Sequence, residues 1–155
     1  MAVRLKKEYF LDVDKQLVWN AILDPNILSK ILPNCQSLVP EGKNKYTAHI
    51  NVKIGPISSK FKSSFEMFDI QELNGYKFRI NGDGVKGSMN GHGEIQLQSK
   101  NDGTSFIFIA EGNVTGVIAR VGQRLIEATG KKLMDRGFED FKIMVMGKSV
   151  VQASL

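Results

Sequence analysis

A few side chains in this 155-residue sequence have the chemistry of a general acid or base, but their spacing keeps them apart. His49 lies on the polar side of an alternating stretch, and His92 alternates away from the small residues beside it. Glu94 shares the predicted face of His92, whereas Asp83 and Glu111 alternate against the apolar residues of their own stretches. No pair of carboxylates falls on a predicted inner face, so we predict no catalytic residue.

Metal and phosphate chemistry also lack their usual residues. Cys35 is the single cysteine, and two histidines cannot complete the ligand set of a structural zinc site. The glycine-rich run at residues 82–87 lies between predicted strands instead of opening a helix, so it is not a phosphate-binding loop. Arg120 and Arg124, one helical turn apart, either hold a carbonyl, carboxylate or phosphate group at a cavity mouth or are solvated helix charges. We predict no metal and no cofactor.

Glycines replace side chains along one predicted strand, and this pattern indicates a cavity. The inner face of residues 88–98 carries Met89 but also Gly91 and Gly93, which contribute no side-chain volume. Aromatic and thioether side chains nearby suit an apolar pocket that adapts to its ligand. The predicted ligand-binding residues are Ile31, Phe61, Phe65, Met67, Phe78, Met89, Gly91, Phe106, Phe108, Val121, Arg124 and Leu125. Each apolar member is equally compatible with an ordinary packed core, so only their combination with glycines favours a pocket.

Predicted strands supply most of these residues. Residues 45–54 alternate between apolar and polar side chains and form the clearest strand. A tight turn at residues 55–56 leads into a second strand, whose change of phase at Phe68 predicts a bulge. Turn residues separate further predicted strands at 3–13, 76–84, 88–98 and 104–115.

Two short helices are predicted after the first strand. A carboxylate at residues 12–14 is placed to cap a helix that begins at Lys15. Asp24 and Pro25 predict a second helix, which Pro33 ends.

One long amphipathic helix is predicted from the helical spacing of apolar residues over 117–145. Gly122, Gly130 and Gly137 lie inside it, where we expect them to permit close approach or a bend rather than to end it. Residues 1–145 are therefore predicted to form one α+β domain, in which a curved antiparallel sheet is wrapped around the C-terminal helix. Residues 146–155 show no pattern and are predicted to be an unstructured or partly ordered tail.

The composition is that of an ordinary globular protein, with 42% hydrophobic and 24% charged residues. Charge interrupts the N-terminal residues before a signal peptide could develop, and no apolar stretch is long enough to span a membrane, so we predict a cytoplasmic protein. The formal net charge is +5, and one hairpin region concentrates the positive charge in Lys43, Lys45, Lys53, Lys60 and Lys62. These lysines either protect a solvated strand pair from aggregation or dock onto a membrane surface or an acidic partner. Nucleic acid is not expected, because the interleaved aromatics alternate toward the core.

Four collinear blocks carry a resemblance to a known family. They read DPNILSKILPNCQSL, VKIGPISSKFK, GDGVKGSMNGHGEIQL and VTGVIARVGQRLIEATGKKLMDRGFEDF. Over residues 3–145 the chain resembles CoxG, the G subunit of carbon monoxide dehydrogenase, within the helix-grip superfamily (SRPBCC) related to START and Bet v 1 domains. Asn34 stands where relatives usually carry glycine, and asparagine tolerates the same left-handed turn. The sequence ends at Leu155, without the apolar C-terminal anchor of many relatives.

The resemblance implies an internal hydrophobic cavity and an accessory role beside a molybdenum hydroxylase, at the cytoplasmic face of the membrane. We therefore expect non-catalytic binding of an apolar molecule such as a quinone or lipid. Two alternatives stay open: a small-molecule enzyme of the polyketide cyclase type that uses His49 or His92, and a pure assembly factor whose lysine-rich surface matters more than its interior.

Overall fold

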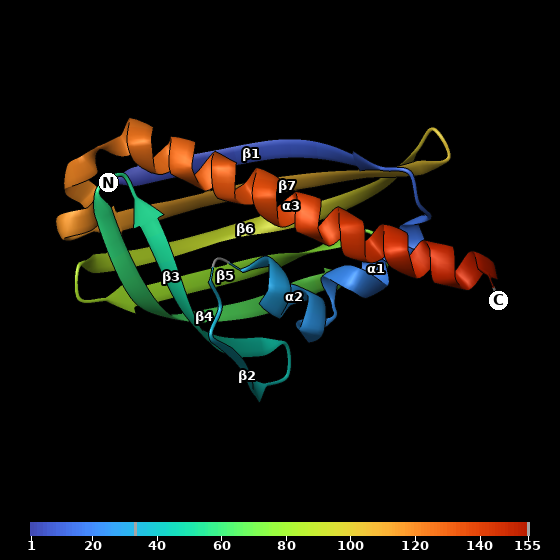
Figure 1. The fold of residues 1–155 in the computed structure, drawn as a ribbon, viewed down its shortest axis with the longest axis horizontal. Helices are drawn as coiled ribbons and strands as arrows, with labels where there is room; N and C mark the ends of the chain where they lie inside the picture. Colours follow the sequence, from blue (N-terminus) through green and yellow to red (C-terminus); the bar gives the residue numbers. More distant parts are fainter. Residues whose placement is uncertain (33, 155) are drawn as a thin grey trace.

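The computed structural model describes residues 1–32 and 34–154, and its main feature there is one antiparallel sheet of seven strands. The strands are β1 (Ala2–Leu11), β2 (Ser37–Gly42), β3 (Lys45–Ile54), β4 (Ile57–Gln71), β5 (Gly75–Gly84), β6 (Gly87–Lys100) and β7 (Gly103–Thr115). Their order across the sheet is β1-β7-β6-β5-β4-β3-β2 (Figure 1). The predicted curved antiparallel sheet is confirmed, with β1 and β2 as its two edges.

The sheet register follows from the alternation of side chains along β3 and β4. Ile50 of β3 pairs with Phe61 of β4, and both side chains are buried on the concave face. The predicted bulge is confirmed, because the register of β4 and β5 shifts between Phe68 and Gln71, and Asp69 there has a φ of 51°. Strand β2 was not predicted, since its six residues include Pro40 and do not alternate.

Two short helices, α1 (Lys15–Ile22) and α2 (Pro25–Ile31), follow β1. Asp24 caps α2 by accepting a hydrogen bond of 2.9 Å from the backbone N–H of Asn26. Asp14 occupies the N-cap of α1 but makes no side-chain capping bond. Pro33, which was expected to end the second helix, lies outside the described residues. Asn34 has a φ of 45°, which is the left-handed conformation expected for it.

The predicted long helix is interrupted near its start. Residues Val117–Val121 form a 3₁₀ turn, η1, and α3 runs from Gln123 to Ser154. The prediction that Gly122 lies inside the helix is wrong, because its φ of 96° is incompatible with a right-handed helix and separates the two segments. Helix α3 also continues through residues 146–154, for which the sequence shows no pattern.

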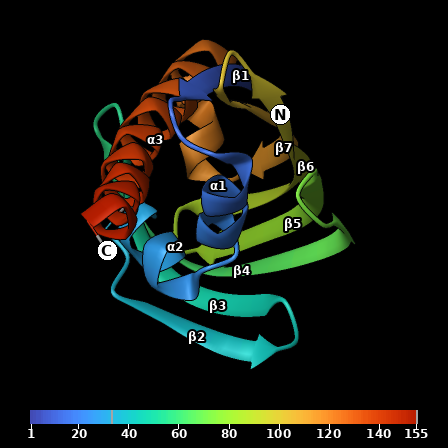
Figure 2. The same cartoon turned by 90° about the vertical axis from the view of Figure 1, so that its right-hand side faces the viewer.

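Helix α3 lies along the edge strand β1 and crosses the concave side of the sheet (Figure 2). Gly130 permits this approach as predicted, because a Cβ atom there would stand 2.8 Å from Cδ1 of Leu5. The backbone N–H of Arg4 donates to Oε2 of Glu127 at 2.8 Å, so α3 also satisfies part of the exposed strand edge. These contacts hold α3 and β1 together.

The interior contains two groups of apolar side chains. The first, which we call the packed cluster, fills the end of the molecule beside η1 and comprises Ala48, Ile50, Val52, Ile54, Phe61, Val114, Ile118 and Ile126. Ile118 of η1 is completely buried and plugs this end. The second group, which we call the cavity cluster, surrounds α1 and α2 and is rich in aromatic rings, including Phe78, Phe106, Phe138 and Phe141. Among the described helices, none combines the length and the apolar character that a transmembrane segment requires.

Candidate ligand cavity

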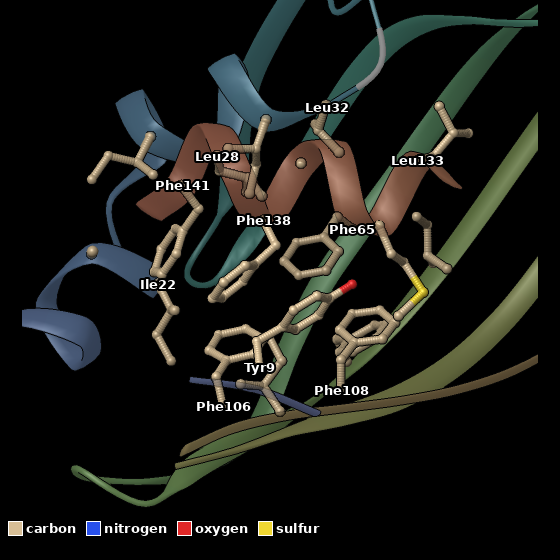
Figure 3. A pocket seen from close by; sticks show the side chains of 18 of the residues that line it. Tyr9, Ile22, Leu28, Leu32, Phe65, Phe106, Phe108, Leu133, Phe138 and Phe141 are labelled. Atoms are coloured by element: carbon tan, nitrogen blue, oxygen red, sulfur yellow. The ribbon is translucent and has the colours of Figure 1, made fainter. Parts of the chain in front are cut away.

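A cavity of about 310 Å³ lies within the cavity cluster, between the concave face of the sheet and the helices. Its wall takes residues from β1, α1, α2, β4, β5, β6, β7 and α3, so it exists only when the whole domain is folded. The lining residues are Tyr9, Ala21, Ile22, Ile27, Leu28, Ile31, Leu32, Phe65, Tyr76, Phe78, Ile80, Ile95, Phe106, Phe108, Leu133, Met134, Gly137, Phe138 and Phe141. Figure 3 shows most of these side chains converging from the strands and from the helices.

Aromatic rings in mutual contact shape much of the wall. The Tyr9 ring stacks on the Phe138 ring at a centroid distance of 4.0 Å and an interplanar angle of 10°. Phe78 contacts Phe65 at 5.6 Å and Phe108 at 5.5 Å in tilted arrangements. Such pairs stabilise one another beyond their buried area, so the cavity has a defined shape.

The described cavity wall carries two hydroxyl groups, and both already donate a hydrogen bond. The Tyr9 hydroxyl donates to Oδ1 of Asp135 at 2.7 Å, and the buried Tyr76 hydroxyl donates to the carbonyl oxygen of Ile22 at 3.3 Å. Burial and the bond to Asp135 raise the pKa of Tyr9, and burial raises the pKa of Tyr76. Both hydroxyls are therefore neutral, and the cavity wall itself carries no charge at neutral pH.

Asp135 stands just outside this wall, on the solvent side of α3. The hydrogen bond from Tyr9 lowers the pKa of its carboxyl group, and Lys7, whose Nζ lies 3.4 Å from Oδ1, lowers that pKa further. Asp135 is thus a carboxylate at neutral pH and acts purely as an acceptor.

The structure brings five of the predicted ligand-binding residues into the cavity wall: Ile31, Phe65, Phe78, Phe106 and Phe108. Phe61, Met89 and Val121 lie instead in or against the packed cluster, because the concave face is long enough to serve both ends of the interior. Met67 is buried within the cavity cluster but does not line the cavity. These four predictions are corrected.

Arg124 and Leu125 do not line the cavity either. Both lie in the exposed first turn of α3, and the break at Gly122 sets this turn beside the packed cluster. Leu125 is 37% exposed and lies against the turn between β3 and β4, where a Cβ at Gly55 would stand 2.8 Å from its Cδ2. Arg120 is exposed as well, so the predicted role of an arginine at the cavity mouth is corrected.

The glycines of β6 do not leave the space that forms the cavity. A Cβ at Gly91 would stand 2.9 Å from the carbonyl oxygen of Glu111, and one at Gly93 would stand 2.7 Å from Cζ of Phe78. Close packing of β6 against β7, and the seating of the Phe78 ring over Gly93, therefore explain these glycines. Gly91 is corrected from a cavity residue to a site of close strand approach.

Apart from Ile31, the helical part of the wall was missed as a binding surface. Leu28 and Leu32, together with Leu133, Phe138 and Phe141, were recognisable as apolar positions at helical spacing, but that pattern cannot separate a core stripe from a cavity wall. Tyr9 was missed altogether, since nothing local marks a tyrosine whose hydroxyl is held by a residue more than a hundred positions away.

The acid-base candidates lie away from the cavity wall. His49 and His92 are exposed, as predicted, on the convex face of the sheet. Asp83 accepts a hydrogen bond of 3.0 Å from the Ser88 hydroxyl, and Oε1 of Glu111 lies 3.7 Å from Nε of Arg4 in an ion pair. Among the described residues, no group of histidine, cysteine and acidic side chains could hold a metal ion.

The curved seven-stranded sheet, the two short helices after β1 and the long C-terminal helix define a helix-grip protein with an apolar interior cavity. The model of the CoxG family, the G subunit of carbon monoxide dehydrogenase, matches residues 10–146, and the chain belongs to this family. Among curated proteins, none matches the chain significantly.

Solved structures share this fold. A conserved protein from Geobacillus kaustophilus is 30% identical, with a TM-score of 0.87 over 95% of this chain and 96% of the other. The ZhuI aromatase/cyclase from Streptomyces sp. R1128 is 11% identical, with a TM-score of 0.69 over 94% and 95% of the two chains. Ara h 8.0201 is 13% identical, with a TM-score of 0.67 over 95% and 99%. The two more distant similarities concern the fold alone.

Proposed function

We propose that this protein binds an apolar small molecule, such as a quinone or a lipid, in the cavity between sheet and helices, without transforming it. The observation that carries the proposal is the wall itself, which surrounds about 310 Å³ with aliphatic and aromatic side chains. Burial of apolar ligand surface supplies roughly 25 cal/mol per Å². The volume lies at the lower end of the range for small-molecule pockets and suits a one- or two-ring group or a short acyl segment.

We further propose that the protein acts as an accessory to a molybdenum hydroxylase of the carbon monoxide dehydrogenase type, in the cytoplasm or at the inner face of the membrane. Membership of the CoxG family supports this role. An accessory protein that carries an apolar molecule needs a cavity of this kind, and the described residues line one with aliphatic and aromatic side chains.

Catalysis of the cyclase type is the alternative raised by the aromatase/cyclase that shares the fold. Both histidines are exposed on the convex face, whereas the cavity opens on the concave side. A general acid or base must come within hydrogen-bonding reach of its substrate, and neither histidine lines the cavity. This placement favours a binder over an enzyme.

The test is native mass spectrometry of the purified protein, followed by organic extraction and identification of any bound molecule. We expect a mass increment that disappears on extraction and corresponds to a quinone or lipid. An empty protein that also fails to bind added quinone or fatty acid would contradict the binding function, and it would favour the pure assembly role.

Peripheral contact with an anionic membrane is the third part of the proposal. Lys43, Lys45, Lys53, Lys60 and Lys62 are exposed, and within the described part of the chain none of them forms an ion pair. Lys60 and Lys62 pair with Asn51 and His49 of β3 in the ladder. On β5, Lys62 is opposite Asp83, whose carboxylate accepts a hydrogen bond from Ser88. An unpaired lysine near an anionic surface contributes about 1 kcal/mol of attraction.

Vesicles containing phosphatidylglycerol test this contact. The double change Lys60→Glu and Lys62→Glu should lower vesicle binding at least tenfold at low salt, measured by sedimentation. The same reversal at the exposed Lys131 and Lys132 of α3 is the control and should have a much smaller effect. Equal effects of the two double variants would show that only net charge matters. If the double variant no longer binds the partner hydroxylase in a pull-down but still binds vesicles, the lysines would be assigned to a contact with a protein partner.

A further inference from the structure

The hydrogen-bonding character of the cavity narrows the class of ligand. We propose that the polar group of the ligand is a hydrogen-bond donor, such as the hydroxyl of a phenol, quinol or alcohol, and that it is received by the Tyr9 oxygen. This inference rests on the proposed binding function and deepens it, because it narrows a quinone-type ligand to its reduced form, the quinol. It assigns Tyr9 as the residue that selects a donor over a carbonyl or a carboxylate.

The first step is the direction of the Tyr9 hydrogen bond. Oδ1 of Asp135 lies 2.7 Å from the Tyr9 hydroxyl, and an ionised carboxylate can only accept. The Tyr9 proton therefore points at Asp135. Lys7, 3.4 Å from the same carboxylate oxygen, favours the ionised state that makes this bond charge-assisted and strong.

The second step is what the hydroxyl then offers to the cavity. A phenol oxygen whose proton is engaged still has lone-pair capacity, so it presents an acceptor to its other neighbours. The Tyr9 ring is fixed by stacking on Phe138, and in Figure 3 its oxygen is directed between Phe65 and Phe108, among the lining side chains. A ligand hydroxyl placed there would donate to an oxygen that Asp135 has already polarised.

The third step is the absence of a competing donor in the described wall. The Tyr76 hydroxyl donates to the carbonyl oxygen of Ile22 at the end of α1, and Tyr76 is only 4% exposed. The remaining lining side chains carry no N–H or O–H group. A ligand carbonyl would meet the lone pairs of Tyr9, or it would have to take the Tyr9 proton away from an ionised acceptor.

Three naphthalene probes and two variants test the proposal by calorimetry or fluorescence titration. The probes are 2-naphthol as donor, 2-acetylnaphthalene as acceptor and 2-methylnaphthalene as apolar reference. Tyr9→Phe keeps the ring and removes the oxygen. It should therefore lower the affinity for 2-naphthol roughly three- to tenfold and change the affinity for the other two probes by less than twofold. Comparing one probe across variants cancels its own desolvation cost.

Asp135→Ala is the second variant, because Asp135 positions the Tyr9 proton without touching the ligand. Its removal frees the proton to turn into the cavity, so 2-acetylnaphthalene should gain affinity severalfold while 2-methylnaphthalene stays unchanged. Asp140 is an exposed carboxylate of the same helix, so Asp140→Ala is the matched control and should leave the affinity for all three probes unchanged. A purely structural role of Asp135 would shift all probes together.

Two results would overturn the inference while leaving the binding function intact. One is that Tyr9→Phe weakens donor and acceptor probes equally, or weakens neither. The other is that Asp135→Ala fails to improve 2-acetylnaphthalene. If the unmodified protein binds none of the three probes, the binding function itself fails, and the inference fails with it.

Discussion

Gly93→Ala should lower the free energy of unfolding by about 3 kcal/mol or more, making it among the most damaging single-methyl changes in the sheet. The added Cβ would stand 2.1 Å from the carbonyl oxygen of Ile109, which is backbone and cannot rotate away. It would also stand 2.7 Å from Cζ of Phe78, a ring of the cavity wall. Chemical denaturation followed by circular dichroism measures the loss.

The matched control is the same substitution at Gly147. That glycine lies in α3, and a Cβ added there would have no atom within contact distance, so alanine should stabilise the helix by up to about 1 kcal/mol. Similar unfolding midpoints for the Gly93 and Gly147 variants would refute the close packing of β6 against β7. They would restore the idea that the glycines of β6 leave empty space.

Phe65→Asp should reduce affinity for any apolar ligand at least a hundredfold, which corresponds to about 2.7 kcal/mol. Phe65 lines the cavity and contacts the Phe78 ring at 5.6 Å, so the change removes apolar wall and introduces a carboxylate beside it. The described lining residues offer that charge no cationic partner, and an ionised group without one is strongly disfavoured in an apolar site. Native mass spectrometry and probe titration on the folded variant measure the loss.

Phe68→Asp provides the control on the same strand. The Phe68 ring does not line the cavity. The Arg79 guanidinium lies over this ring, with its Cζ 4.1 Å from the ring centroid, so a carboxylate at position 68 gains a cationic neighbour. Ligand affinity should stay within about threefold of the unmodified protein. If both variants lost affinity equally, the loss would reflect general destabilisation of β4, and Phe65 would have no particular place in ligand binding.

Much of the fold could be predicted from local patterns. Alternation in residues 45–54 marked β3, and the change of phase near Phe68 located the bulge that the structure contains. The left-handed Asn34 and the close approach at Gly130 were also predictable, because each depends on the conformational or steric property of one residue type.

The cavity was predictable in kind but only partly in position. The periodicity of strands and helices identifies which side chains face inward, and five of the predicted ligand-binding residues do line the cavity. It does not say how far along a strand the filled part of the interior extends. The extent of the filled part depends on Ile118 of η1, which precedes the break at Gly122 that was not predicted. Ile118 is fully buried and fills one end of the interior, so Phe61 and Met89 lie in or against the packed cluster.

The glycines of β6 were misleading as a signal for the position of the cavity. In a strand it marks either space or close backbone approach, and the sequence alone could not separate the two. Gly91 and Gly93 serve close approach, because their strand neighbours occupy the positions where side chains would stand. The empty volume instead lies among large side chains contributed by the strands and by α1, α2 and α3.

The division of the interior into a packed cluster and a cavity cluster bears on how such a chain can diverge. Residues such as Ile50 and Ile118 have neighbours on all sides, so truncating them should be costly in any descendant. Side chains such as Ile31 and Leu133 face empty volume on one side, so exchanging them for other apolar residues removes fewer contacts. Natural variation can therefore remodel ligand preference at the hollow end while the filled end preserves the scaffold.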